Sequence, residues 1–133
     1  MTLRGRILVV DDDPMVLFVF RDTLRDLGDA YEIVTAQSGL KAINEVREQP
    51  FDLVITDLNM PDLGGIELTE AIRQESPDTA IVWITAYGCH SRSSDAARLE
   101  IHRCYDKPLE VDEILQVARD ALENGAVYGE GRR

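Results

Sequence analysis

The chain has 133 residues, of which 44% are hydrophobic and 29% are charged, as is typical of a single globular domain with one substantial core. The net charge of −11 argues against binding through a broad nucleic-acid or anionic-membrane surface, and it fits an acidic protein that binds a cation. The sequence contains no apolar run that could span a bilayer and no start typical of a signal peptide, so we expect a cytoplasmic protein without membrane contact.

The first part of the chain predicts a strand, a helix and a second strand. Residues 6–10 are apolar and end in three aspartates, and a helix should follow from Pro14 to about Leu27. Asp13 is its expected N-cap and Gly28 its expected end. Residues 31–35 alternate in polarity, which favours an edge strand. The helix residues expected to cover a sheet are Val16, Val19, Phe20, Leu24 and Leu27.

This assignment leaves Leu17 and Phe18 pointing elsewhere, either toward a partner or toward a neighbouring helix of the same domain. The next helix is expected at residues 39–49, with Ser38 as N-cap. Its apolar residues at helical spacing are Leu40, Ile43 and Val46.

The central strand is predicted at residues 53–56, an apolar run of the kind buried on both faces of a sheet. It leads directly into Asp57, and Pro61 prevents the strand from continuing. A helix should then begin at Gly64 and Gly65 and run to about Glu75. Its expected buried residues are Ile66, Leu68, Ala71 and Ile72.

The last third of the chain predicts two more strands, at residues 79–85 and 101–105. Residues 91–100 are polar and predict only a marginal helix, whereas residues 111–122 predict a clear amphipathic one. Five strands that alternate with five helices indicate an α/β fold with one doubly wound parallel sheet. We expect one domain over residues 3–124 and a flexible C-terminal tail at 125–133.

The two cysteines, Cys89 and Cys104, do not form a Cys-x-x-Cys motif, and we expect both to be reduced thiols. A zinc site with His90 and His102 is conceivable, but the spacing matches no zinc-finger pattern.

Reactive residues follow several of the predicted strands. Asp11 and Asp12 follow the first, Asp57 ends the third, Thr85 ends the fourth and Lys107 follows the fifth. Each alone has an ordinary structural explanation as a helix cap, turn residue or surface charge. In a parallel sheet, however, the carboxyl ends of the strands share one edge, where ligands bind. We therefore expect these side chains to form one cleft.

The chemistry of this set favours phosphoryl transfer. Neighbouring carboxylates repel one another, and a divalent cation such as Mg²⁺, which prefers oxygen ligands, removes that conflict. A carboxylate can also attack phosphorus and form an aspartyl phosphate. Lys107 would supply positive charge for the phosphoryl oxygens, and Thr85 a hydrogen-bond donor.

From about Arg6 to Glu123, the chain resembles the receiver domain of two-component response regulators. The residues that carry the resemblance are Val9-Val10-Asp11-Asp12, Asp57-Leu58-Asn59-Met60-Pro61, Thr85-Ala86 and Lys107-Pro108, in the order and at the spacing of that family. The resemblance implies a flavodoxin-like sheet of order 2-1-3-4-5. It also implies a cis Lys107–Pro108 bond.

By this resemblance, Asp57 accepts a phosphoryl group from a sensor histidine kinase or histidine phosphotransfer protein. Asp11, Asp12, Asp57 and the backbone carbonyl of Asn59 would provide the Mg²⁺ site. Thr85, Lys107 and the Ala86 backbone N–H would bind the phosphoryl group. Such a protein is a phosphoacceptor that takes part in its own phosphotransfer and slow dephosphorylation, and not an enzyme with a separate substrate. Its output would be a change in protein contacts, and one such contact is a phosphorylation-dependent homodimer. Direct nucleic-acid binding is not expected.

The sequence departs from the family pattern on the last strand. The family has an aromatic switch residue three positions before the lysine, and here that position is Cys104. Tyr105 comes one residue later and should point to the opposite face of the sheet. Cys104 and Tyr105 therefore mark the expected output face. Gly64 replaces a frequent acid but remains an acceptable helix cap, and Tyr87 could shield an acyl phosphate from water.

Three other functions are consistent with parts of the sequence. A phosphatase of the haloacid dehalogenase type also uses an aspartate and Mg²⁺, but it needs an acid where this chain has Asn59. An adaptor that has the fold without the chemistry is disfavoured by the intact set of reactive residues. A flavin carrier would need a phosphate-binding loop after the first strand, and the sequence has none there.

Overall fold

The computed structural model describes residues 4–86 and 88–124. Within them, one parallel sheet has the strand order β2-β1-β3-β4-β5. Its strands are β1 (Gly5–Val10), β2 (Tyr31–Ala36), β3 (Leu53–Asp57), β4 (Ala80–Thr85) and β5 (Arg103–Asp106). The doubly wound, flavodoxin-like sheet is therefore confirmed. Tyr87 and the expected tail at 125–133 lie outside the described residues.

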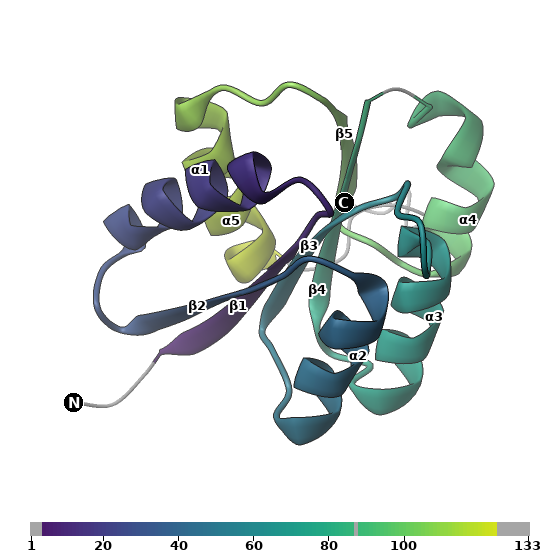
Figure 1. The fold of residues 1–133 in the computed structure, drawn as a ribbon, viewed down its shortest axis with the longest axis horizontal. Coiled ribbons are helices and arrows are strands. Elements are labelled where there is room, and N and C mark those ends of the chain that lie inside the picture. The colour runs from purple at the N-terminus through teal and green to yellow at the C-terminus, as the bar shows by residue number, and fades with distance from the viewer. Residues whose placement is uncertain (1–3, 87, 125–133) are drawn as a thin grey trace.

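Helices cover both faces of the sheet (Figure 1). They are α1 (Pro14–Leu24), α2 (Gly39–Glu48), α3 (Gly65–Glu75), α4 (Ser93–Arg98) and α5 (Val111–Asn124). Figure 1 shows α1 and α5 together on one face, and α2, α3 and α4 on the other. None of the helices in the described part of the chain is long and apolar enough to cross a bilayer.

Alternate residues of each strand belong to two separate hydrophobic clusters, because successive side chains of a strand point to opposite faces. Val54 and Trp83 pack in the cluster on the α2–α4 face, whereas Ile55 and Ile84 pack in the cluster under α1 and α5. The fully buried indole of Trp83 donates a hydrogen bond to Thr69 Oγ1 at 2.8 Å, which connects β4 to α3.

The predicted helix caps are confirmed. The Asp13 side chain accepts a hydrogen bond from the Met15 N–H at 2.9 Å, and Pro14 occupies the first position of α1. Ser38 Oγ accepts from the Lys41 N–H at 3.2 Å at the start of α2. The last turn of the first predicted helix is a separate 3₁₀ turn (Arg25–Leu27), and Gly28 ends it with a φ of 105°.

The predicted buried face of α1 was partly wrong. Leu17 is buried at 6% exposure, whereas Val19 is 38% exposed and lies beside the exposed Phe18. Every residue from 15 to 20 is apolar, so periodicity could not fix the rotation of this helix, and its packing against α5 and β2 decides it. Leu40 of α2 is likewise exposed, while Ala42 is buried in its place.

Arg73 of α3 holds two turns together through four backbone carbonyls. Its guanidinium donates to the carbonyl oxygens of Thr79 at 2.6 Å and Pro77 at 3.2 Å, in the turn before β4. It also donates to Leu99 at 2.8 Å and Glu100 at 3.0 Å, in the turn before β5. Burial lowers the pKa of Arg73 from its usual value, but the side chain stays charged at neutral pH. This contact fixes the end of α4.

We predict that Arg73→Met lowers the free energy of unfolding by about 2–3 kcal/mol, because it leaves part-buried carbonyls without their charged donor. Urea denaturation of both proteins measures the difference. Arg47→Met is the matched control, since the Arg47 side chain is 58% exposed and pairs only with Glu75 at the surface. That change should cost about 0.5 kcal/mol or less. Equal losses in the two variants would contradict the structural role of Arg73.

Candidate functional site

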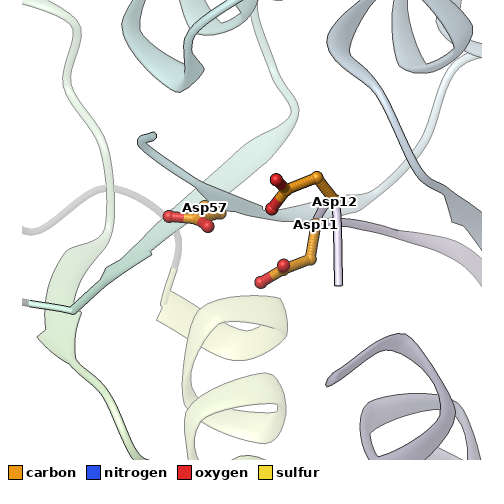
Figure 2. Close-up of side chains that lie close together, drawn as sticks. All are labelled: Asp11, Asp12 and Asp57. Atoms are coloured by element: carbon orange, nitrogen blue, oxygen red, sulfur yellow. The ribbon is translucent and has the colours of Figure 1, made fainter. Parts of the chain in front are cut away.

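Three carboxylates meet at the carboxyl edge of the sheet. Val10 at the end of β1 is in register with Thr56 on β3, so Asp11 and Asp12 emerge beside Asp57. One oxygen from each lies within 4.8 Å of the others (Figure 2). Asp11 and Asp57 are buried, whereas Asp12 is exposed to solvent. The predicted acidic cluster therefore forms, with one open side.

Lys107 supplies a positive charge to the two buried carboxylates. Its Nζ lies 2.9 Å from Asp11 Oδ2 and 3.2 Å from Asp57 Oδ2. Burial by itself would lower the pKa of Lys107, but the hydrogen bond and charge of Asp11, together with Asp57, raise it overall. The Lys107–Pro108 peptide bond that follows β5 is cis, as expected.

For Asp11, the effect of burial on the pKa outweighs that of the contact with Lys107. Burial raises the pKa of its carboxyl group, although the Lys107 hydrogen bond opposes the change. A raised carboxyl pKa means that the folded protein holds this proton more tightly than the unfolded chain does. The ionised Asp11 therefore costs stability at neutral pH, whereas the Lys107 charge contributes stability that is lost only as the pH rises through its raised pKa.

Asn59 connects Asp57 to Thr85. The Asn59 backbone N–H donates to Asp57 Oδ1 at 3.1 Å, and its side-chain amide donates to Thr85 Oγ1 at 3.1 Å. Thr85 is buried at the end of β4, and Ala86 follows it. A cleft of about 400 Å³ opens here, lined by Asn59, Thr85, Ala86, Gly88, Ser91 and Arg92. The predicted strand-end residues therefore lie together at one edge of the sheet.

Two residues that shape this site were not found from the sequence. Gly65 begins α3 directly beneath Asp57: a Cβ there would collide with the Asp57 carbonyl oxygen and would lie 2.8 Å from Leu58 Cα. Asp62 accepts hydrogen bonds from the Gly39 and Leu40 N–H groups at the start of α2, which lower the pKa of its carboxyl group. Gly64 is the N-cap of α3, as expected.

The donor set fits a hard divalent cation. Asp11, Asp12 and Asp57 offer only carboxylate oxygens, which Mg²⁺ and Ca²⁺ prefer. Lys107 balances one of the three negative charges, and a divalent ion at the exposed side would balance the remainder. The cluster is therefore compatible with a metal site.

The expectation of two reduced thiols was wrong, because Cys89 and Cys104 form a disulfide. The sequence showed only their separation; the fold brings the loop after β4 beside β5, where Cys104 is in register with Trp83. Neither sulfur is therefore available as a zinc ligand in this structure. Cys104 packs in the cluster on the α2–α4 face and Tyr105 in the cluster under α1 and α5, which confirms that their side chains lie on opposite faces.

This architecture, with acids, a lysine and a threonine at the sheet edge, matches a known family. The family model of the response regulator receiver domain matches residues 7–119. The transcriptional regulatory protein GlrR of Escherichia coli (strain K12) is 32% identical over 122 residues, which are 92% of this chain and 27% of that protein. The sensor histidine kinase RcsC of Salmonella typhi is 33% identical over 124 residues, which are 93% of this chain and 12% of that protein.

The fold agrees with these relatives. The solution structure of the beryllofluoride-activated NtrC4 receiver domain dimer matches with a TM-score of 0.80 at 28% identity, and the match covers 89% of this chain and 96% of that one. The chain belongs to the response regulator receiver domain family, and it is a receiver of a two-component phosphorelay. It spans only a small part of the two curated relatives.

We predict that Asp12→Asn stabilises the protein in the presence of a chelator by about 1 kcal/mol, because it removes one of three mutually repelling carboxylates. The same change should largely abolish the stabilisation that added Mg²⁺ gives the wild type. Thermal denaturation with EDTA and with Mg²⁺ measures both effects.

Asp13→Asn is the matched control, since Asp13 lies outside the cluster and asparagine caps a helix as well as aspartate does. This variant should keep the wild-type response to Mg²⁺. An equal loss of the response in both variants would contradict a specific metal site.

Proposed function

We propose that Asp57 is the residue of this receiver that accepts the phosphoryl group. The observation that supports it best is the environment of its carboxylate. Asp57 is buried at the end of a central strand, has Lys107 Nζ at 3.2 Å, and lies beside two further carboxylates and an open cleft. A buried carboxylate in contact with a lysine is suited to nucleophilic attack on phosphorus.

The transfer forms a bond between an Asp57 carboxylate oxygen and phosphorus. With a phosphohistidine donor, the P–N bond breaks and the imidazole leaves with its electron pair. Lys107 and the Ala86 N–H would stabilise the phosphoryl oxygens, and positioning of this kind supplies most of the catalysis in phosphoryl transfer. The Thr85 hydroxyl can accept from the Asn59 amide and donate to a phosphoryl oxygen at the same time, since a hydroxyl has one proton and two lone pairs.

The metal we propose is Mg²⁺, held by the Asp11, Asp12 and Asp57 carboxylates and the Asn59 backbone carbonyl. Bound there, it would neutralise the charge that develops on the transferred group. A dehalogenase-type phosphatase is disfavoured, because Asn59 cannot carry a proton and its amide is bonded to Thr85. The protein then takes part in its own phosphorylation and slow dephosphorylation, without a separate substrate.

The phosphoryl donor we propose is a sensor histidine kinase or a histidine phosphotransfer protein, in the cytoplasm. The relatives named above include a transcriptional regulator and a sensor kinase, which is consistent with either arrangement. On α1, the exposed apolar residues Met15, Phe18 and Val19 offer the donor a docking surface, and Val19 lines the same cavity as Lys107. For the output we propose protein contacts around the last strand, where Cys104 and Tyr105 lie, among them a homodimer such as the NtrC4 neighbour forms.

We predict that acetyl phosphate with Mg²⁺ adds one phosphoryl group to the wild-type chain, seen as an increase in intact mass. The adduct should be absent in EDTA and absent in Asp57→Asn, which retains the size of the side chain but not the nucleophile. A wild-type level of adduct in Asp57→Asn would place the acceptor elsewhere. A missing adduct in the wild type, with Mg²⁺ binding shown separately by calorimetry, would refute the phosphoacceptor role.

A further inference from the structure

The disulfide joins the segment after β4 to the last strand. Cys89 lies in the connection between β4 and α4, Cys104 lies on β5, and their Cα atoms are 5.7 Å apart. Both residues are half-buried. The bond closes a loop with a sequence separation of 15 that contains the whole of α4.

Besides this bond and the turn that Arg73 fixes, the enclosed helix is held by an exposed ion pair of Arg98 with Glu70 of α3 at 3.0 Å and by a small buried contact. Helix α4 has six residues, and no side chain caps its N-terminus at Arg92. Ala96 is its buried residue, and Leu99 packs just after it. A helix this short is not stable by itself. The covalent link at Cys89 adds a constraint just before its N-terminal end.

The linked segment also forms one wall of the proposed phosphorylation site. Ala86 and Gly88 line the cleft together with Thr85 and Asn59. The disulfide joins Cys89, which directly follows Gly88, to β5. When it is reduced, this covalent link between the segment that forms the wall and β5 is lost.

We propose that Cys89 and Cys104 are a redox modification site, and that its disulfide form resists the rearrangement that phosphorylation of Asp57 requires. The modification site is inferred from the geometry of the two cysteines. Its effect on the rearrangement rests on the proposed function of Asp57. Disulfides in a reducing cytoplasm are usually transient and serve catalysis or redox sensing, which is consistent with a pair that forms and breaks beside a signalling site.

The reaction partner is a small disulfide of the glutathione class. One protein thiolate attacks a sulfur of glutathione disulfide and releases one glutathione thiolate, which leaves a mixed disulfide. The second protein thiolate then attacks the protein sulfur of the mixed disulfide and releases the second glutathione. The protein loses two protons and two electrons, and two glutathione molecules carry them. Excess reduced glutathione, or a dithiol, reverses the reaction.

The coupling to phosphorylation has a reciprocal form. If the disulfide favours the unphosphorylated arrangement of the cleft wall, a ligand that favours the phosphorylated arrangement must bind the reduced protein more tightly. By thermodynamic linkage, that ligand must shift the thiol–disulfide equilibrium toward the thiols by the same factor. Beryllofluoride, a chemical mimic of the phosphoryl group on aspartate, is a suitable ligand.

The first experiment tests the modification site without phosphorylation. The full chain is equilibrated in glutathione buffers of increasing disulfide content, and thiols are counted by alkylation and intact mass. We expect both thiols to disappear together, with the loss of two hydrogens and no dimer. Cys89→Ser and Cys104→Ser each have one thiol, which can form only a mixed disulfide with glutathione, so these variants should gain the mass of one glutathione and not lose two hydrogens. If both wild-type thiols remain alkylatable at high glutathione disulfide, the proposal is overturned.

The second experiment measures beryllofluoride affinity by calorimetry, in Mg²⁺, for the oxidised protein and for protein reduced with a phosphine. We expect the reduced form to bind about fivefold more tightly or better, within the usual range of coupling between two sites. Cys89→Ser, a change in a loop, should bind like the reduced wild type whatever the redox conditions.

The same affinity in both redox forms would overturn the coupling and leave the function of Asp57 intact. Binding to neither form, as expected for Asp57→Asn, would instead refute the proposed function and the coupling with it. The glutathione titration decides the modification site separately in both cases. Saturating beryllofluoride should also raise the ratio of reduced to oxidised protein at a given glutathione buffer composition by the factor that calorimetry gives.

Discussion

The ion pairs of Lys107 with Asp11 and Asp57 are the interactions on which the site depends. Two carboxylates buried at the ends of adjacent strands would otherwise repel each other in a region of low dielectric. The lysine comes from the far end of the chain, so its contact also holds the end of β5 against the centre of the sheet.

The two layers around the sheet are held by different means. On one face, α1 and α5 pack through large apolar side chains such as Phe20 and Ile114. On the other, α3 is fixed closely beneath Asp57 because Gly65 leaves room for the strand backbone, whereas the shorter α4 depends on Arg73 and on the disulfide. The side of the site formed by α3 is therefore held more firmly than the side formed by the segment between β4 and α4. Weakly held segments of this kind are the ones that rearrange in conformational switches.

The last strand shows how one position alters such a switch. Tyr105 points toward α1 and α5, so it cannot take the place of an aromatic residue at position 104. A covalent bond occupies that position, and it connects β5 to the very segment that carries Thr85 and Ala86. In this receiver, the position where the family has an aromatic ring is therefore held by a covalent bond.

The sequence by itself determined the five strands, their parallel arrangement, the helix caps at Asp13 and Ser38, and the convergence of Asp57 with Asp11, Asp12 and Lys107. These features follow from local periodicity and from the rule that parallel strands end at one edge. Only the tertiary structure decided the rotation of α1, the close approach at Gly65 and the pairing of Cys89 with Cys104. Each of these depends on distances between segments far apart in the chain, and no local pattern encodes such distances.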